Sequence, residues 1–249
     1  MKLLSKQRGF DALPVLAGLA GVAVIVALGL VFGYAPTERS MGIVQKIFYF
    51  HVPSAIAAYL GFLIACIGSC WYLVTGDVRG DVIGRAGAEA GVLFCLIVLT
   101  SGPLWARKAW GSFWTGEPRL MLTLVLFLIF CAYLVVRSFG GRTELTRRIG
   151  AVLAILGVAD IPLVRVAVQR WRGNHPQVLR GEGGGITDEM QVALMAGFVA
   201  VSLLFATLMW LRVRVGFAEE DLETTWRALQ QREDRVEDAE RLTLAGASG

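Results

Sequence analysis

Histidine, cysteine and charge are all scarce in this sequence. Of 249 residues, two are histidine, four are cysteine and 18% are charged. No CxxCH motif occurs, which excludes a c-type cytochrome, and no GxxxxGKS/T motif occurs, which excludes nucleotide hydrolysis at a P-loop. The formal net charge of +4 is modest and does not indicate a nucleic-acid partner.

The cysteines are missing from the polar connections as well. Cys66, Cys70, Cys95 and Cys131 all lie within long apolar stretches. A disulfide framework or a thiol redox site would need thiols that are accessible outside the hydrocarbon. We therefore expect these cysteines to pack as small apolar side chains.

Long apolar runs are abundant. Hydrophobic residues make up 55% of the chain and its mean hydropathy is +0.60. A transmembrane helix needs about 20 mainly apolar residues. We predict an all-α fold: a polytopic membrane protein with a bundle of six transmembrane helices and short extracytoplasmic interfacial segments. The expected spans are about 13–33, 54–74, 86–104, 120–138, 149–168 and 190–211.

These spans form a membrane domain over residues 1–211, and the densely charged segment 212–249 is expected to be a cytoplasmic tail. The first apolar run is too long for a signal-peptide core, so we expect it to remain as the first span. Lysine and arginine before this run favour a cytoplasmic N-terminus, although the bias of basic residues between the two faces is weak. The basic residues expected beside the fourth and fifth spans on the cytoplasmic face are Arg137, Arg142, Arg147 and Arg148.

Both histidines fall on the opposite face. With six spans, the connections after spans one, three and five share the extracytoplasmic side; His51 lies in the first of them and His175 in the third. Pro53 suits the first turn of the second span, so we expect His51 to stand just above the mouth of that helix. The connection after span three is the segment 105–119, WARKAWGSFWTGEPR.

The segment 105–119 is too aromatic for an ordinary connection, which is normally polar. It contains Trp105, Trp110 and Trp114. Trp110 and Trp114 would share one face of a helix, with Gly111 leaving backbone uncovered between them. An aromatic belt at the membrane interface is one interpretation. A flat apolar platform for a ligand, rimmed by basic side chains, is the other.

Two histidines beside an aromatic platform suggest a metal-containing ligand. Imidazole ligates zinc, copper and iron, but a zinc site normally uses four ligands at short spacings, and this face offers no cysteine and no such motif. Haem needs two axial ligands, a flat apolar surface and cations for its propionates. His51 and His175 would be the ligands, the tryptophans the surface, and Lys46 and Arg119 the cations. Two interfacial histidines without a ligand are the alternative.

Three separated motifs resemble one known family. They are QKIFYFHVPSA around His51, GPLWARKAWGSFW in the tryptophan segment, and DIPLVRVAVQRWRGNHPQV leading to His175. Across residues 36–211 the sequence resembles haem exporter protein C, the CcmC family of the system I pathway of cytochrome c maturation.

The resemblance implies a haem-binding protein of the cytoplasmic (inner) membrane that is not an enzyme. Such a protein would hold haem b, non-covalently and transiently, on the periplasmic side and deliver it to a periplasmic haem chaperone. A small single-span accessory subunit and ABC transporter subunits are the other implied partners, besides membrane lipid. The implied haem-binding residues are His51, His175, Trp105, Trp110, Gly111, Trp114, Arg119 and Lys46, with the two histidines as axial ligands of the iron.

The sequence departs from the family pattern at two positions, because Gly116 stands in place of a third tryptophan and Glu117 in place of an aspartate. A haem lyase component of the same superfamily is one alternative function, although such proteins carry further histidines within their spans. A permease subunit is another. Its only support is Asp160 in the fifth span, which has a structural alternative as a partner of Arg165 or as a cap of the helix break at Pro162.

Overall fold

The computed structural model describes residues 11–170 and 186–247. Apart from one isolated bridge between Glu38 and Gly42, the regular structure within these ranges is entirely helical. This confirms the predicted all-α class. The helices are α1 (Ala12–Gly29), a π-helical turn η1 (Leu30–Tyr34), a 3-10 turn η2 (Ile43–Ile47), α2 (Phe48–Thr75), α3 (Val78–Trp110), α4 (Pro118–Phe139), α5 (Glu144–Arg170) and α6 (Asp188–Ala247).

The polytopic character predicted from composition is also confirmed. Within the described residues, five helices are long and apolar enough to cross a membrane: Ala12–Tyr34, Ile43–Thr75, Val78–Trp110, Pro118–Phe139 and Asp188–Ala239. The sixth expected span, 149–168, lies within α5, a helix of 27 residues that packs along α4. At 1.5 Å per residue, α5 is roughly 40 Å long, which exceeds the thickness of the hydrocarbon.

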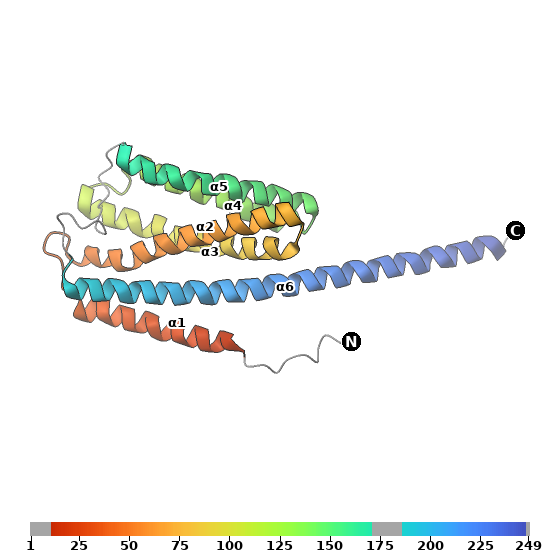
Figure 1. Cartoon of the computed structure of the whole chain (residues 1–249), viewed down its shortest axis with the longest axis horizontal. Helices are drawn as coiled ribbons and strands as arrows, with labels where there is room; N and C mark the ends of the chain where they lie inside the picture. The colour runs from red at the N-terminus through yellow and green to blue at the C-terminus, as the bar shows by residue number, and fades with distance from the viewer. Residues whose placement is uncertain (1–10, 171–185, 248–249) are drawn as a thin grey trace.

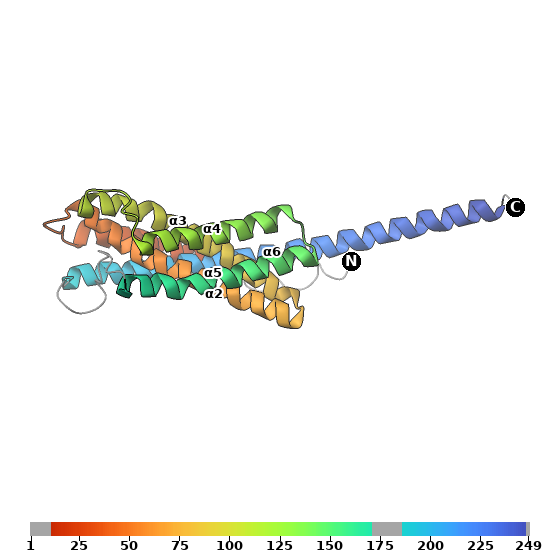
Figure 2. The ribbon, with the colours of Figure 1, turned by 90° about the horizontal axis from the view of Figure 1, so that it is seen from above.

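The helices run along one common axis (Figure 1). The central helix is α2, which packs against α3, α5 and α6, while α1 lies on the outer side of α6. The principal core contains a stacked pair of rings from α2 and α4, Phe62 and Phe130, whose centroids are 4.0 Å apart. The view from above shows α6 continuing far beyond the bundle (Figure 2).

Glycines allow α2 and α3 to approach at backbone distance. A Cβ atom on Gly61 would lie 2.6 Å from the backbone nitrogen of Gly91, and one on Gly68 would lie 2.5 Å from the carbonyl oxygen of Gly80. No side chain fits into such a gap. Close packing of small residues is a main source of helix association in a membrane, where no hydrophobic driving force exists between helices.

The bundle has two chemically different ends. At the end that we call the His51 end lie the C-terminal ends of α1, α3 and α5 and the N-terminal ends of α2, α4 and α6 (Figure 1). A second apolar cluster there joins Val31 after α1, Tyr49 of α2 and Leu194 of α6. The first turns of α6 are therefore held beside the beginning of α2.

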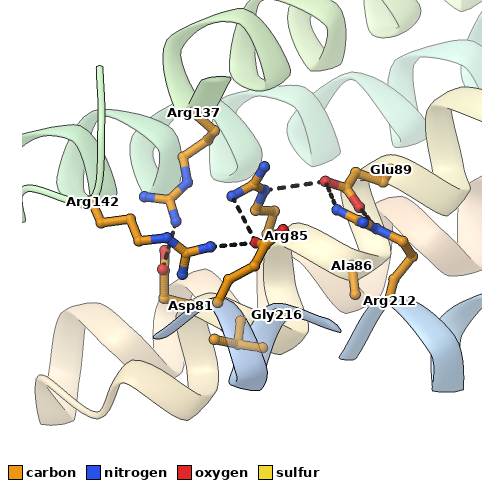
Figure 3. A pocket seen from close by; sticks show the side chains of 10 residues that line it. Asp81, Arg85, Ala86, Glu89, Arg137, Arg142, Arg212 and Gly216 are labelled. Atoms are coloured by element: carbon orange, nitrogen blue, oxygen red, sulfur yellow. Dashed lines mark hydrogen bonds and ion pairs between the residues drawn. The ribbon is translucent and has the colours of Figure 1, made fainter. Parts of the chain in front are cut away.

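At the other end, hydrogen bonds between charged side chains join four helices. Figure 3 shows the adjoining pocket, with Asp81, Arg137 and the pair of Arg212 and Glu89. Asp81 of α3 accepts hydrogen bonds of 2.6 Å from Arg137 of α4 and Arg147 of α5, and Arg147 also donates to Glu220 of α6 at 2.6 Å. We call these four residues the Asp81 network. Beside it, Arg212 of α6 pairs with Glu89 of α3, and Arg142 pairs with Glu219 and Glu220. The network ties α6 to α3, α4 and α5 at this end.

Candidate functional site

His51 is half-buried in the first turn of α2, against α3. Its Nδ1 lies 2.9 Å from the hydroxyl oxygen of Ser101, and within the described part of the chain its Nε2 has no hydrogen-bond partner. A Cβ atom on Gly102 would lie 3.3 Å from the ring carbon Cε1, so the absence of a side chain there lets the imidazole rest against the backbone of α3. One ring nitrogen is thus held by the protein and the other is available.

The location of His51 differs from the sequence-based expectation. The helix begins at Phe48, ahead of the apolar run, and Pro53 lies inside it. The preceding 3-10 turn leads directly into α2, so His51 belongs to the helix rather than to the connection above it. This placement gives the imidazole a fixed direction toward α3.

Trp105 and Trp110 close the end of α3 above this histidine. The Trp105 indole donates through Nε1 to the side-chain oxygen of Gln45, 3.3 Å away, which ties α3 to the turn before α2. The two indole rings meet edge to face, with centroids 5.5 Å apart and an interplanar angle of 87°. Edge-to-face contact is a favourable arrangement of aromatic rings. It makes a corner rather than a single flat face.

Trp114 does not continue the helical face of Trp110. The helix ends at Trp110, and Gly111 follows as a left-handed cap with φ +77°. Arg107 donates to the carbonyl of Gly111 and lies 5.6 Å from the ring centre of Phe113. Phe113 and Trp114 are 55% and 37% exposed. They form an exposed aromatic pair on the connection between α3 and α4.

Arg119 lies in the first turn of α4, after Pro118 at the helix start. Its charge is close enough to act on both His51 and Tyr59 of α2. A proline at the first helical position leaves no unsatisfied N–H and fixes where the helix begins. Among the described residues, Arg119 is a cation whose charge reaches His51.

Lys46 lies in a different environment. Its side chain is buried, and Nζ donates to the carbonyl oxygens of Val31 at 2.7 Å and Ala35 at 3.3 Å. It also lies 5.5 Å from the ring centre of Phe32. The ammonium group thus caps the carbonyl end of α1 and η1. This geometry does not favour the role expected for Lys46, contact with a ligand carboxylate.

The connection between η1 and η2 is ordered by Glu38. Its carboxylate accepts from the backbone N–H of Met41 and from the hydroxyl of Ser40, which is 2.7 Å away. These hydrogen bonds, that from Met41 foremost, lower the pKa of Glu38 below its usual value. The carboxylate is thus charged at neutral pH and holds this connection in a compact turn.

The predictions for His175 as a haem ligand and for Arg165 as a partner of Asp160 concern parts of the chain that the structure does not describe. His175 lies outside the described residues, and so does the side chain of Arg165. The helices on either side of the undescribed stretch, α5 and α6, end and begin at the His51 end (Figure 1). Asp160 of α5 is only 7% exposed, and its Oδ2 has no hydrogen-bond partner among the described atoms.

Three residues that sequence reasoning missed complete this site: Gln45, Ser101 and Gly102. The sequence could have placed Ser101 near the tryptophans, because Ser101 precedes Trp105 by one turn and so lies on the same face of α3. No signal in the sequence pairs it with His51, which is fifty positions away.

The bundle and its aromatic end define the class: a polytopic helical membrane protein with a histidine and a tryptophan corner at one end. The family described as Heme exporter protein C matches residues 6–228. Similar curated proteins are Heme exporter protein C of Paracoccus denitrificans, 30% identical over 225 residues (88% of this chain and 90% of that protein), and that of Bradyrhizobium diazoefficiens, 30% identical over 192 residues (76% and 73%).

A putative cytochrome c biosynthesis ccmC-like mitochondrial protein of Arabidopsis thaliana is 27% identical over 214 residues, covering 86% of this chain and 80% of that protein. The chain belongs to the Heme exporter protein C family. It is therefore a haem-handling membrane protein of cytochrome c biosynthesis.

Proposed function

We propose that this chain holds haem b, non-covalently and transiently, at the His51 end, and that it delivers the haem to a periplasmic haem chaperone. His51 and His175 are the axial ligands of the iron. The observation that carries the proposal is the state of His51: Nδ1 is held by Ser101, while Nε2 has no partner within the described residues. A metal-binding histidine typically has this arrangement, with its second nitrogen engaged by a neighbouring polar group.

The residues at this end fit a haem. Bound haem would supply an iron atom with two axial positions for imidazole, a broad apolar ring and two carboxylates. His51 offers one imidazole nitrogen, Trp105 and Trp110 offer apolar area, and Arg119 offers a cation for a propionate. Arginine suits this contact because its planar guanidinium can donate two parallel hydrogen bonds to a carboxylate.

His175 is proposed as the second ligand on grounds of sequence and chain path. The chain has only two histidines. The end of α5 and the beginning of α6, between which His175 lies in the sequence, both belong to the His51 end, and α6 packs there against the turn that carries His51. These positions support a site formed by two connections of the bundle.

The proposed placement is on the periplasmic side of the cytoplasmic membrane. The exposed pair Phe113 and Trp114 then faces the compartment of the chaperone and offers it an apolar contact. The other proposed partners are a small single-span subunit and the ABC transporter subunits of the maturation system. Binding and release, with no bond made or broken in the substrate, make the protein a carrier rather than an enzyme.

The test is the haem content and spectrum of purified variants. His51→Ala and His175→Ala should each lose most bound haem and the low-spin Soret band, because each removes one axial ligand. Trp210→Ala is the control for a change at a membrane surface: Trp210 is 52% exposed on α6, two residues before Arg212, which pairs with Glu89 at the opposite end from His51. If both histidine variants keep the haem content and spectrum of the unaltered protein, the ligand assignment is wrong.

A further inference from the structure

We propose that Ser101 is a positioning residue that fixes the tautomer of His51, so that the ring proton resides on Nδ1 and the lone pair on Nε2. The consequence for iron binding depends on the proposed function, whereas the position of the proton can be measured without any haem. A neutral imidazole carries one N–H and one acceptor nitrogen, and only the acceptor can ligate a metal.

The argument follows from counting protons around one hydroxyl group. Ser101 Oγ lies 2.6 Å from the carbonyl oxygen of Ile97, one turn earlier in α3, and 2.9 Å from His51 Nδ1. A serine hydroxyl has a single hydrogen to donate and two lone pairs to accept with. The carbonyl oxygen of Ile97 can only accept. The serine hydrogen therefore goes to Ile97, and the hydrogen between Ser101 and His51 must come from Nδ1.

The opposite arrangement is unfavourable. If Ser101 donated to Nδ1 instead, its oxygen would lie 2.6 Å from the Ile97 carbonyl oxygen with no hydrogen between them. That separation is normal for an O–H···O hydrogen bond but brings lone pairs together when the hydrogen is missing. Back-bonding of a helical serine to the carbonyl four residues earlier is also its usual way of satisfying the hydroxyl inside an apolar helix.

Two neighbours support the fixed ring. Gly102, adjacent to Ser101, has no side chain to push the imidazole away, and α3 is a continuous helix through this region. Thr100, on the other side of Ser101, has an equivalent hydroxyl that bonds only to carbonyls of its own helix, Leu96 and Ile97. Thr100 is exposed, so it provides a matched control.

The direct experiment is nitrogen-15 NMR of the haem-free protein labelled at histidine, at pH about 8, where an ordinary imidazole is neutral. The chain has only two histidines, so His175→Ala leaves a single imidazole signal, that of His51. We expect protonated Nδ1 and unprotonated Nε2. Adding Ser101→Ala should move the proton to Nε2 in a large share of molecules, while Ser101→Thr and Thr100→Ala should leave it on Nδ1.

Haem retention is the second readout. Loss of the group that hydrogen-bonds the second nitrogen of a metal-binding histidine typically lowers metal affinity about 10-fold to 100-fold. We expect a loss of that size for Ser101→Ala in the otherwise unaltered protein, recovery with Ser101→Thr, and no change with Thr100→Ala. A proton found on Nε2 in the haem-free protein, or a tautomer that Ser101→Ala leaves unchanged, overturns the inference.

The two proposals fail in different ways. If the proton resides on Nδ1 and depends on Ser101, but His51→Ala keeps full haem content, the ligand assignment of the proposed function is wrong and the control of the tautomer by Ser101 stands. If His51→Ala loses haem while the proton resides on Nε2, the proposed function stands and the positioning role of Ser101 is overturned.

Discussion

Buried cations at the two ends of the bundle donate hydrogen bonds to different kinds of partner. Lys46, at the His51 end, donates to backbone carbonyls, whereas Arg137 and Arg147 at the other end share the carboxylate of Asp81. The sequence presents all three as basic residues near the ends of apolar runs. Only the structure separates them from flanking charges that face water, because separation in the sequence says nothing about which carboxylate lies within reach.

Asp81→Asn should destabilise the protein strongly. It leaves two buried guanidinium groups without their shared counter-charge, and breaking one partner of a buried pair costs about 3–5 kcal/mol. We expect a clear drop in the thermal midpoint in detergent.

The matched control is Glu144→Gln, which removes an exposed ion pair with Arg148 whose side chains are 70% and 65% exposed. Exposed pairs contribute about 0–1 kcal/mol, so this midpoint should barely move. Equal shifts for the two variants would contradict a stabilising role of the Asp81 network.

Lys46→Met separates the two roles considered for this lysine. Removing the ammonium leaves carbonyls of Val31 and Ala35 unsatisfied, which costs about 1–3 kcal/mol for a buried group. The thermal midpoint should fall, while haem per folded molecule should equal that of the unaltered protein. Loss of haem with an unchanged midpoint would restore Lys46 as a haem contact.

At the scale of elements, hydropathy located the helices but not their ends. The third span was expected at 86–104, yet α3 extends over Val78–Trp110 because Asp77 caps its start, accepting from the N–H of Arg79 at 2.8 Å, and Gly111 caps its end. Hydropathy detects the part inside hydrocarbon, whereas capping decides where the helix stops. The same difference placed His51 above α2 instead of within it.

The departure at Gly116 has a backbone explanation. Its φ is +68°, a conformation that side-chain-bearing residues rarely adopt. The connection before α4 therefore follows a path that a tryptophan at this position would disfavour.

Gly68→Ala tests the contact between α2 and α3. The new methyl group would lie 2.5 Å from the carbonyl oxygen of Gly80, so the two helices must separate. Overpacking of this kind typically costs about 1–3 kcal/mol, seen as a lower thermal midpoint. Gly18→Ala is the control, because a methyl group on Gly18 of α1 would meet nothing within 4 Å. A thermal midpoint unchanged by Gly68→Ala would show that α2 and α3 are not closely packed at this position.

For the whole molecule, the apolar runs in the sequence predicted the fold class. Their number predicted that the first and third connections lie at the same end of the bundle. The geometry at the site did not, because the bond from His51 to Ser101 and that from Trp105 to Gln45 join residues 50 and 60 positions apart. Such contacts depend on how α2 and α3 pack. The glycines at which these two helices approach determine that packing, and hydropathy does not describe it.

The orientation can be tested with single cysteines in a background where the native cysteines are replaced. A membrane-impermeant maleimide applied to intact spheroplasts should label Ser112→Cys and Gln177→Cys, because the proposed function requires both connections on the periplasmic side. Ser138→Cys, exposed at the other end of α4, should react only after lysis. Labelling of positions 112 and 177 from opposite sides would rule out a shared haem site.

The single helix α6 begins beside His51 and runs without interruption to Ala247. Near the end of the bundle, Arg227 of this helix donates to the backbone carbonyl of Arg142. At 1.5 Å per residue, the stretch 228–247 is a rod roughly 30 Å long. The number of residues in this stretch therefore sets the distance between the bundle and a partner bound at the tip of the helix. Deleting one residue would shorten that distance by about 1.5 Å and rotate the tip by about 100°.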